Sequence, residues 1–273
     1  MMIRSAILNV MTKAAQKAGR SLVRDFGEVE QLQVSRKGPG DFVSTADKKA
    51  ERIVIEELER ARPEASILAE ESGTKEGDDP TKRFIVDPLD GTTNFLHGLP
   101  HWAISIAYEE RGDLIAGVVF DPIKDELFWA ERGQGAFLND RRIRVSARQN
   151  LADAVVGTGI PHIGRDTKGH ILFQRRLAAV MGNTAGVRRW GTASLDLCYV
   201  AAGRFDAFWE RALSPWDVAA GAVILKEAGG FITDASGRAY KVDSVDTVAA
   251  NDSLHPAFLK LLKDASKEEK AAE

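Results

Sequence analysis

The heptapeptide Asp87-Pro88-Leu89-Asp90-Gly91-Thr92-Thr93 follows the short apolar run 84–86, which is typical of a buried strand. The carboxyl end of a strand is where α/β proteins tend to bind their ligands. Pro88 fixes its own φ angle and Gly91 permits a tight turn, so carboxylates three residues apart can face one point. This heptapeptide is the strongest candidate for a functional site in the chain.

The two aspartates of the heptapeptide predict a cation site. Carboxylates held side by side repel each other unless a positive charge joins them. Oxygen ligands, with no nearby Cys and no paired His, favour Mg²⁺ over Zn²⁺. Gly91, Thr92 and Thr93 would add backbone N–H groups and a hydroxyl at a helix start, where anions bind. The alternative is an acidic turn whose side chains only cap the following helix.

Other acids stand at the ends of predicted elements and strengthen the cation hypothesis. They are Glu70 and Glu71 after the run 66–69, Asp47 in the first turn of a helix that Thr45 would cap, and Asp217 at the start of an apolar helix. For Glu71, Asp47 or Asp217 alone, a surface or helix-dipole role is the simpler explanation. Their combination with the heptapeptide favours a shared site.

Three other kinds of site fit the sequence poorly. A phosphatase with a covalent aspartyl intermediate needs Asp-x-Asp-Gly-Thr, but Pro88 stands at the nucleophile position. A serine hydrolase needs Gly-x-Ser-x-Gly, which does not occur in the sequence. His97 and His101 are separated by Gly98 and Pro100, which argues against a zinc-binding pair on one helical face.

Composition limits the class of protein. The chain has 273 residues, 44% of them hydrophobic and 28% charged, as expected of one large or two small globular domains. A formal charge of −3 excludes a basic nucleic-acid footprint over the whole chain. The single cysteine, Cys198, rules out an intrachain disulfide and a Cys-based zinc site. With no membrane-length apolar run and no secretory segment, we expect a cytoplasmic protein.

Hydrophobic periodicity predicts alternating helices and strands. We expect helices over residues 1–24, 45–62, 166–181, 192–202, 216–228 and 255–262. We expect strands over residues 66–69, 84–86, 102–108, 114–120, 126–130, 136–138, 142–145, 155–158, 205–210, 231–233 and 248–250. Residues 73–83 are polar, contain Gly and Pro, and are predicted to form a loop.

This order of elements indicates an α+β chain in packed layers. The pattern changes near Leu151, so we expect an N-terminal part over 1–150 with the heptapeptide and a C-terminal part over 151–262 with Trp216-Asp217. Residues 263–273 are rich in Lys, Glu and Ala and are predicted to form a flexible tail. The two parts would form one compact catalytic unit.

Four segments together resemble a known family. Phe84-Ile-Val-Asp-Pro-Leu-Asp-Gly-Thr-Thr-Asn-Phe95 resembles the first signature of the inositol monophosphatases, and Trp216-Asp-Val-Ala-Ala-Gly221 with Glu227-Ala-Gly-Gly230 resembles the second. Gly191-Thr-Ala-Ser-Leu-Asp-Leu197 and Asp41-Phe-Val-Ser-Thr-Ala-Asp47 also match in order and spacing. The resemblance covers residues 1–260 approximately, and it is closest to the bacterial inositol-1-monophosphatase branch.

The resemblance implies a layered αβαβα sandwich, usually dimeric, that hydrolyses small phosphate monoesters with magnesium and is often inhibited by lithium. Two or three Mg²⁺ ions would bind at each site. Glu70, Asp87 and the carbonyl of Leu89 would hold the first ion, and Asp87, Asp90 and Asp217 would hold the second. A third, weaker ion would depend on Glu70.

The resemblance also assigns roles around the substrate. Thr92, oriented by Asp47, would activate the attacking water, so no side chain of the protein would attack phosphorus. The N–H groups of Gly91 and Thr92 would bind phosphate. The substrate-contacting set would be Glu70, Asp90, Gly91, Thr92, Gly191, Thr192, Ala193, Glu210 and Asp217.

For the substrate, the resemblance favours hydrolysis of myo-inositol 1-phosphate to myo-inositol and phosphate. Related enzymes act on fructose-1,6-bisphosphate, 3′-phosphoadenosine 5′-phosphate, histidinol phosphate or NADP, and these remain alternatives because function on a shared fold depends on the pocket rim. A further alternative is a binding role in transcription or ribosome maturation through contact with RNA polymerase, with the basic pair at Arg188 as a possible surface. Direct contact with nucleic acid or a membrane is not expected.

Overall fold

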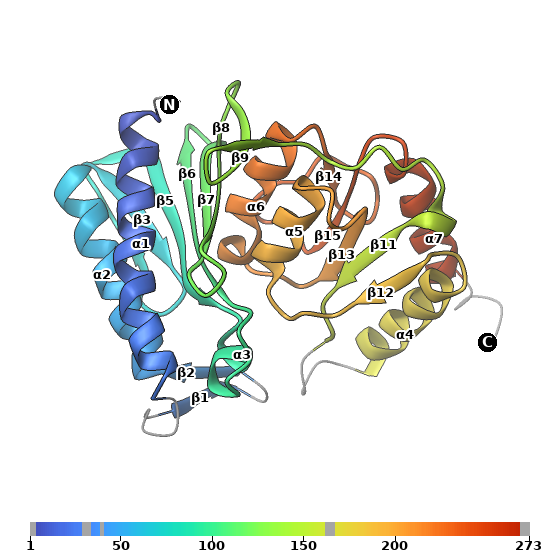
Figure 1. The fold of residues 1–273 in the computed structure, drawn as a ribbon, viewed down its shortest axis with the longest axis horizontal. Helices are drawn as coiled ribbons and strands as arrows, with labels where there is room; N and C mark the ends of the chain where they lie inside the picture. Colours follow the sequence, from blue (N-terminus) through green and yellow to red (C-terminus); the bar gives the residue numbers. More distant parts are fainter. Residues whose placement is uncertain (1–3, 29–33, 39–40, 162–166, 268–273) are drawn as a thin grey trace.

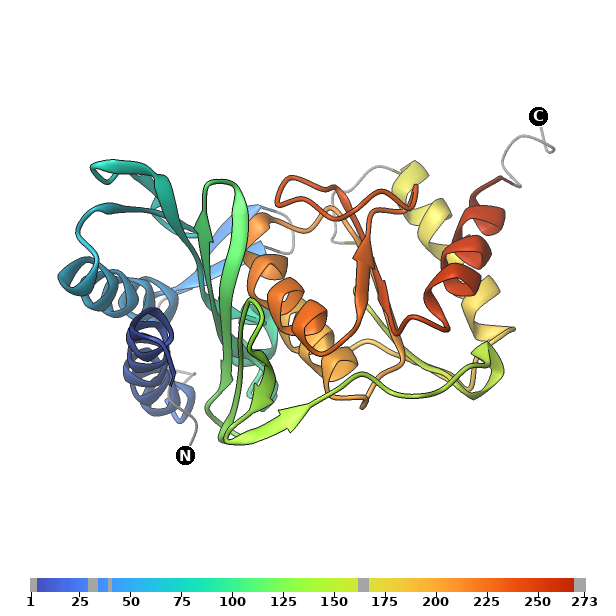
Figure 2. The same ribbon diagram turned by 90° about the horizontal axis from the view of Figure 1, so that it is seen from above.

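Helices and sheets alternate in five layers (Figures 1 and 2). The computed structural model describes residues 4–28, 34–38, 41–161 and 167–267. From one outer layer to the other, the helices are α1 (Ala6–Phe26) and α2 (Thr45–Ala61), then α5 (Ala193–Ala201) and α6 (Pro215–Glu227), then α4 (Thr167–Met181) and α7 (His255–Lys267). A sheet lies on each side of the middle pair. The expected αβαβα sandwich is confirmed.

The larger sheet has eight strands in the order β10-β9-β8-β7-β6-β5-β3-β4, and only the pair of β3 and β5 is parallel. Its strands are β3 (Ala65–Ala69), β4 (Gly73–Lys75), β5 (Asp79–Asp90), β6 (Ala103–Glu110), β7 (Asp113–Asp121), β8 (Glu126–Glu131), β9 (Gly135–Leu138) and β10 (Arg141–Ile143). Between β5 and β6 lies the short helix α3 (Thr92–Leu96). The sheet thus delivers the end of β5 to the middle layer.

The smaller sheet has five strands in the order β12-β11-β13-β15-β14. They are β11 (Val155–Thr158), β12 (Gly186–Arg188), β13 (Ala207–Arg211), β14 (Phe231–Thr233) and β15 (Asp246–Ala250). A separate hairpin of β1 (Val34–Gly38) and β2 (Asp41–Ser44) leads directly into α2. The division of the chain at residue 150 into two parts stays a prediction.

The middle helices approach their neighbours closely because small residues face each contact. A Cβ added to Gly117 of β7 would lie 2.5 Å from the carbonyl oxygen of Ala220 on α6. A Cβ added to Gly221 would lie 2.7 Å from the Cβ of Leu197 on α5. Both distances are shorter than side-chain contacts allow, so glycine is required for this spacing.

Several helices match the sequence-based expectations. The helices predicted over 45–62, 192–202 and 216–228 begin and end within one residue of α2, α5 and α6. The N-cap of α2 is Ser44 rather than the expected Thr45, because the Ser44 hydroxyl accepts the N–H bonds of Ala46 and Asp47. Helix α7 extends to Lys267, so the first five residues of the predicted tail are helical, and residues 268–273 lie outside the described residues.

The loop predicted over residues 73–83 is wrong. Residues Gly73–Lys75 form β4 and β5 begins at Asp79, because β3 and β6 supply hydrogen-bonding partners on either side. Hydrogen bonding to the neighbouring strands therefore decides the conformation of this segment despite its polar composition. The hairpin of β1 and β2 and the edge strand β12 were also not expected from the sequence. Residue 166, the predicted start of α4, lies outside the described residues.

The outer helices α1 and α2 are joined by a buried carboxylate. The side chain of Glu57 is only 5% exposed and forms ion pairs with Lys13 at 2.9 Å and Lys17 at 2.8 Å. Arg60 adds a third cation at 3.3 Å. Hydrogen bonds from Lys17 and Lys13 lower the pKa of Glu57 to about 2. The ionised carboxylate therefore favours the folded state.

We expect Glu57→Gln to lower the free energy of unfolding by about 1–2 kcal/mol at pH 7, because it removes the negative charge from these ion pairs. The loss is not larger because the partner cations are partly exposed to solvent. Since folding lowers the Glu57 pKa, the wild-type advantage is complete above its ordinary pKa and shrinks as the pH falls toward 2. Urea unfolding at pH 7 and pH 3.5 measures both effects. Glu56→Gln is the control because Glu56 is 52% exposed. Equal losses in the two variants, or a pH-independent difference, would contradict the assignment.

Candidate active site

The acids of the heptapeptide lie within strand β5, not after it as the sequence suggested. Asp87 pairs with Ser105 and Asp90 pairs with Ala103, so the β5 segment has one residue more than the facing segment of β6. Residues three apart on a regular strand point to opposite faces, and one extra residue brings them to the same face. This irregularity allows both carboxylates to face the middle layer.

Gly91 is the N-cap of α3 and has a φ angle of +96°, which side chains rarely adopt. A Cβ at this position would lie 2.6 Å from Oγ1 of Thr192 and 3.2 Å from the carbonyl oxygen of His101. Glycine is therefore required both by the backbone conformation and by the space available. Gly91 lets the segment that contains Thr192 pack directly on the acidic turn.

Four carboxylates from three different elements interact at this point. Burial raises the pKa of Asp87 well above its usual value, and repulsion from Glu70, Asp90 and Asp217 raises it further. Burial and repulsion from Asp90 likewise raise the pKa of Asp217 well above its usual value. Burial raises the pKa of Asp90 to about 6, although the hydrogen bond from Ser194 opposes the shift. The structure thus brings these four predicted residues together.

Backbone N–H groups hold one oxygen of three of these acids. Leu89 N donates to Asp87 Oδ1 at 3.0 Å. Ser194 N donates to Asp90 Oδ2 at 2.8 Å, and Ser214 N donates to Asp217 Oδ2 at 2.7 Å. Within the described ranges, no group of three or more Asp, Glu, His or Cys side chains has an arrangement that could hold a metal ion. The donor chemistry nevertheless fits Mg²⁺, which takes carboxylate and carbonyl oxygens and keeps several waters.

Asp47 and Thr92 are in direct contact, as the resemblance implied. The Thr92 hydroxyl lies 3.1 Å from Asp47 Oδ1 and 3.1 Å from the carbonyl oxygen of Leu89. The other oxygen of Asp47 accepts bonds from the N–H and hydroxyl of Ser44. Burial raises the pKa of Asp47, while the hydrogen bonds from Ser44 and Thr92 lower it. A hydroxyl has one proton, so Thr92 donates to only one of its two acceptors at a time.

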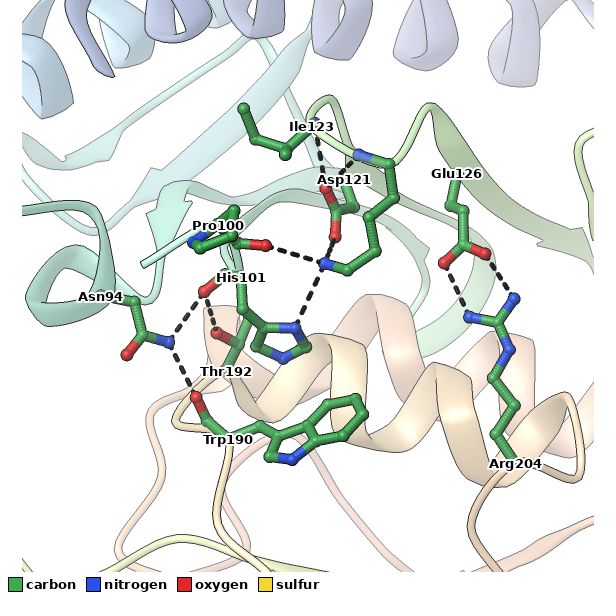
Figure 3. A network of polar contacts seen from close by, with 10 residues as sticks. Asn94, Pro100, His101, Asp121, Ile123, Glu126, Trp190, Thr192 and Arg204 are labelled. Carbon is green, nitrogen blue, oxygen red and sulfur yellow. Dashed lines mark hydrogen bonds and ion pairs between the residues drawn. The ribbon is translucent and has the colours of Figure 1, made fainter. Parts of the chain in front are cut away.

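The predicted substrate residues surround the same acids. The carboxyl group of Glu210 on β13 packs against Gly159, and burial and repulsion from Asp90 raise the Glu210 pKa to about 8. Thr192 is the N-cap of α5, and its hydroxyl donates to the carbonyl of His101 at 3.1 Å (Figure 3). The Ala193 N–H also bonds Asp90. Gly191, with a φ angle of +79°, connects this segment to Trp190.

Two residues of the 191–197 segment were quoted from the sequence but given no role. Ser194 donates the N–H that holds Asp90. Asp196 is buried, and neither of its carboxylate oxygens has a hydrogen-bond partner in the part of the chain that the structure describes. Burial raises the Asp196 pKa well above its usual value, and Glu210 and Asp90 add to the shift. An acid in an otherwise apolar helix was the signal available in the sequence.

Comparison with known proteins agrees with this geometry. The family model described as the inositol monophosphatase family matches residues 4–267. An inositol-1-monophosphatase of Rhizobium meliloti is 57% identical over 262 residues, which are 96% of this chain and 98% of the relative. A Nus factor SuhB of Pseudomonas aeruginosa is 43% identical over 255 residues, which are 93% of this chain and 94% of the relative.

A crystal structure of the extragenic suppressor protein suhB from Bartonella henselae matches with a TM-score of 0.92 and 55% identity, covering 95% of this chain and 99% of that one. The five-layer fold, the buried acids and these relatives define a phosphatase that acts on small phosphate monoesters. The chain belongs to the inositol monophosphatase family, whose members are generally magnesium-dependent. Among the described residues, no helix is long and apolar enough to cross a membrane.

We expect Gly91→Ala to abolish most of the phosphatase activity and to destabilise the protein by about 2–3 kcal/mol, because it adds both backbone strain and a collision with Thr192. Gly98→Ala is the matched control, since Gly98 has a φ angle of +68° but no atom within 4 Å of the added Cβ. That variant should lose only about 1 kcal/mol and keep its activity. Urea unfolding and initial rates with magnesium measure both quantities. Equal behaviour of the two variants would show that contact with Thr192 is unimportant.

Proposed function

We propose that this protein hydrolyses myo-inositol 1-phosphate to myo-inositol and phosphate. The observation that carries the proposal is the close approach of the buried Asp87 and Asp90 to the partly exposed Glu70 and Asp217, whose mutual repulsion calls for divalent cations. The inositol-1-monophosphatases among its relatives support the choice of substrate. The other phosphate monoesters acted on by related enzymes remain the alternatives.

The proposed ligands follow the residues that meet in the structure. Glu70, Asp87 and the carbonyl of Leu89 would hold one Mg²⁺, and Asp87, Asp90 and Asp217 would hold a second. A third, weaker ion would depend on Glu70. When bound, magnesium would neutralise the phosphate oxygens and stabilise the negative charge that develops during hydrolysis. The carboxylates of this donor set raise one another's pKa, which is expected of a site that a divalent cation neutralises.

The protein groups next to these acids orient the reaction. The Thr92 hydroxyl, held by Asp47, would orient the attacking water through its oxygen lone pairs. The N–H groups of Gly91 and Thr92 would receive the phosphate. Pro88 provides no carboxylate at the position where a covalent aspartyl nucleophile would stand, so water attacks phosphorus directly. Because the Thr92 hydroxyl is already positioned, the attacking water would need less reorientation when the reaction occurs.

The alcohol part of the substrate would contact Gly191, Thr192, Ala193 and Glu210. Glu210 is half-buried near the acids but lies on β13, a strand from which no other predicted ligand comes. A carboxyl group in such a position suits hydrogen bonding to ring hydroxyls. The homodimer implied by the family resemblance is part of the same proposal.

A second candidate function is a contact with RNA polymerase, and the specific observation that favours it is the similarity to Nus factor SuhB proteins. Arg188 on the edge strand β12 is exposed and could contribute to such a surface. Binding of purified RNA polymerase by a catalytically inactive variant would favour this role in addition to hydrolysis. Failure of both the active and the inactive protein to bind would remove it.

We expect Asp90→Asn to reduce magnesium-dependent hydrolysis by a factor of about 10² or more, because it removes one charge from the proposed ligand set. Excess EDTA should abolish the wild-type rate. Asp206→Asn is the matched control, because Asp206 is also buried but pairs with Arg148 and the N–H of Val155. Initial rates on folded protein, checked by circular dichroism, decide the comparison. Wild-type rates in EDTA or in the Asp90 variant would overturn the proposed metal site.

We expect Glu210→Gln to lower kcat/KM for myo-inositol 1-phosphate about tenfold, which corresponds to the loss of one hydrogen bond to a charged or polar partner. The same variant should hydrolyse an aryl phosphate that has no ring hydroxyls at close to the wild-type rate. The ratio of the two kcat/KM values is the measurement. Equal losses on both substrates would remove Glu210 from substrate selection.

A further inference from the structure

The buried side chain of Asn94 connects two segments that are far apart in sequence. Asn94 lies on α3, directly after Thr92 and Thr93, and is only 4% exposed. Its amide nitrogen donates to the carbonyl of His101 at 2.8 Å and to the carbonyl of Trp190 at 2.7 Å (Figure 3). The two amide protons of one –NH₂ group can serve two carbonyls at once, which a hydroxyl or a carboxylate of similar size cannot do.

The segment Trp190–Ser194 is held at three points, and each point leads to the acidic turn. Asn94 holds the carbonyl of Trp190. The hydroxyl of Thr192 donates to the same His101 carbonyl that Asn94 binds, at 3.1 Å. The N–H of Ser194 holds Asp90. The segment therefore has little freedom to move relative to β5 and α3 while these bonds are present.

Lys124 holds the Pro100–His101 segment that carries this carbonyl. The Lys124 ammonium group donates to the carbonyl of Pro100 at 3.1 Å and lies 3.3 Å from Nδ1 of His101. The same ammonium group forms an ion pair with the fully buried Asp121. Because a lysine ammonium only donates, Nδ1 of His101 is assigned as the acceptor of this contact. The acceptor shared by Asn94 and Thr192 thus belongs to a rigid part of the structure.

We propose that Asn94 is a positioning residue, which sets the Trp190–Ser194 segment, and with it the substrate-facing end of α5, against the acidic turn. This inference rests on the proposed function in one respect, namely that Gly191, Thr192 and Ala193 contact the substrate. The bonds of the Asn94 amide go to two backbone carbonyls, so Asn94 would act through the segment and not on the substrate itself. Its removal leaves the Trp190 carbonyl without the Asn94 donor and the His101 carbonyl with Thr192 as its remaining side-chain donor, which loosens the segment.

The decisive variant is Asn94→Ala, and Asn251→Ala is its matched control. Asn251 is 1% exposed, and its amide donates to the carbonyls of Ser146 and Arg148, which lie more than 100 residues earlier in the chain. Both substitutions therefore remove a buried amide that joins distant backbone segments. Only Asn94 is bonded to the segment that is proposed to face the substrate.

Two measurements follow on the full-length protein. Amide hydrogen exchange of a peptide spanning 186–197 should accelerate at least tenfold in Asn94→Ala and stay unchanged in Asn251→Ala. Steady-state kinetics with myo-inositol 1-phosphate and magnesium should show KM raised about tenfold in Asn94→Ala with a smaller change in kcat, because binding geometry is lost more than the reacting groups. In Asn251→Ala, KM should stay within twofold of the wild type.

A second pair of variants keeps the test decisive if Asn94→Ala does not fold. Thr192→Val removes one donor to the His101 carbonyl and should accelerate exchange over 186–197 by a smaller factor, while Thr192→Ser keeps a hydroxyl and should return exchange to the wild-type rate. Only exchange is measured in this pair, because Thr192 is itself a proposed substrate contact. Unchanged exchange over 186–197 in Asn94→Ala, or in Thr192→Val where that variant stands in, overturns the proposed positioning. Faster exchange with wild-type KM overturns its role in substrate binding. A wild-type protein inactive on phosphate monoesters would instead overturn the proposed function, and hydrogen exchange would still decide the structural part.

Discussion

Repulsion among buried carboxylates is the constraint around which this structure is organised. Asp87 and Asp90 are buried and Asp217 is half-buried, so water screens their charges poorly, and the pKa values of Asp87 and Asp217 are raised by the neighbouring carboxylates. In isolation such a cluster opposes folding, because burying an unpaired charge is costly. The rest of the molecule must therefore supply enough stability elsewhere to hold the cluster together. Backbone N–H groups from three different segments perform part of that task.

The layered architecture explains how acids from distant parts of the sequence reach one place. The large sheet brings in β5, while the middle layer brings in the first turns of α5 and α6. That layer fits only because Gly117 and Gly221 let helices and sheet approach closely. Placement of Asp90 and Asp217 is consequently a matter of packing distances as much as of local conformation.

Local features of this fold were predictable from the sequence, and features that depend on pairing were not. Helices α2, α5 and α6 have clear hydrophobic periodicity, and Pro88 and Gly91 indicated a turn in which the acids of the heptapeptide can face one point. The 73–83 segment was mistaken for a loop because β3 and β6 decide its conformation. The roles of Ser194 and Asn94 depend on bonds to residues about 100 positions away, which no local pattern encodes.

Two of the site acids are also parts of helix ends. In α2 and in α6, the N–H of the serine N-cap donates to an aspartate three residues later, namely Asp47 and Asp217. A contact over three residues forms quickly in a folding chain and needs no distant partner. Each of these bonds therefore orients its acid relative to its own helix by a local contact alone. Conversely, fraying of the first turn of either helix would disorient its acid and reduce activity while both sheets and the hydrophobic core remained intact.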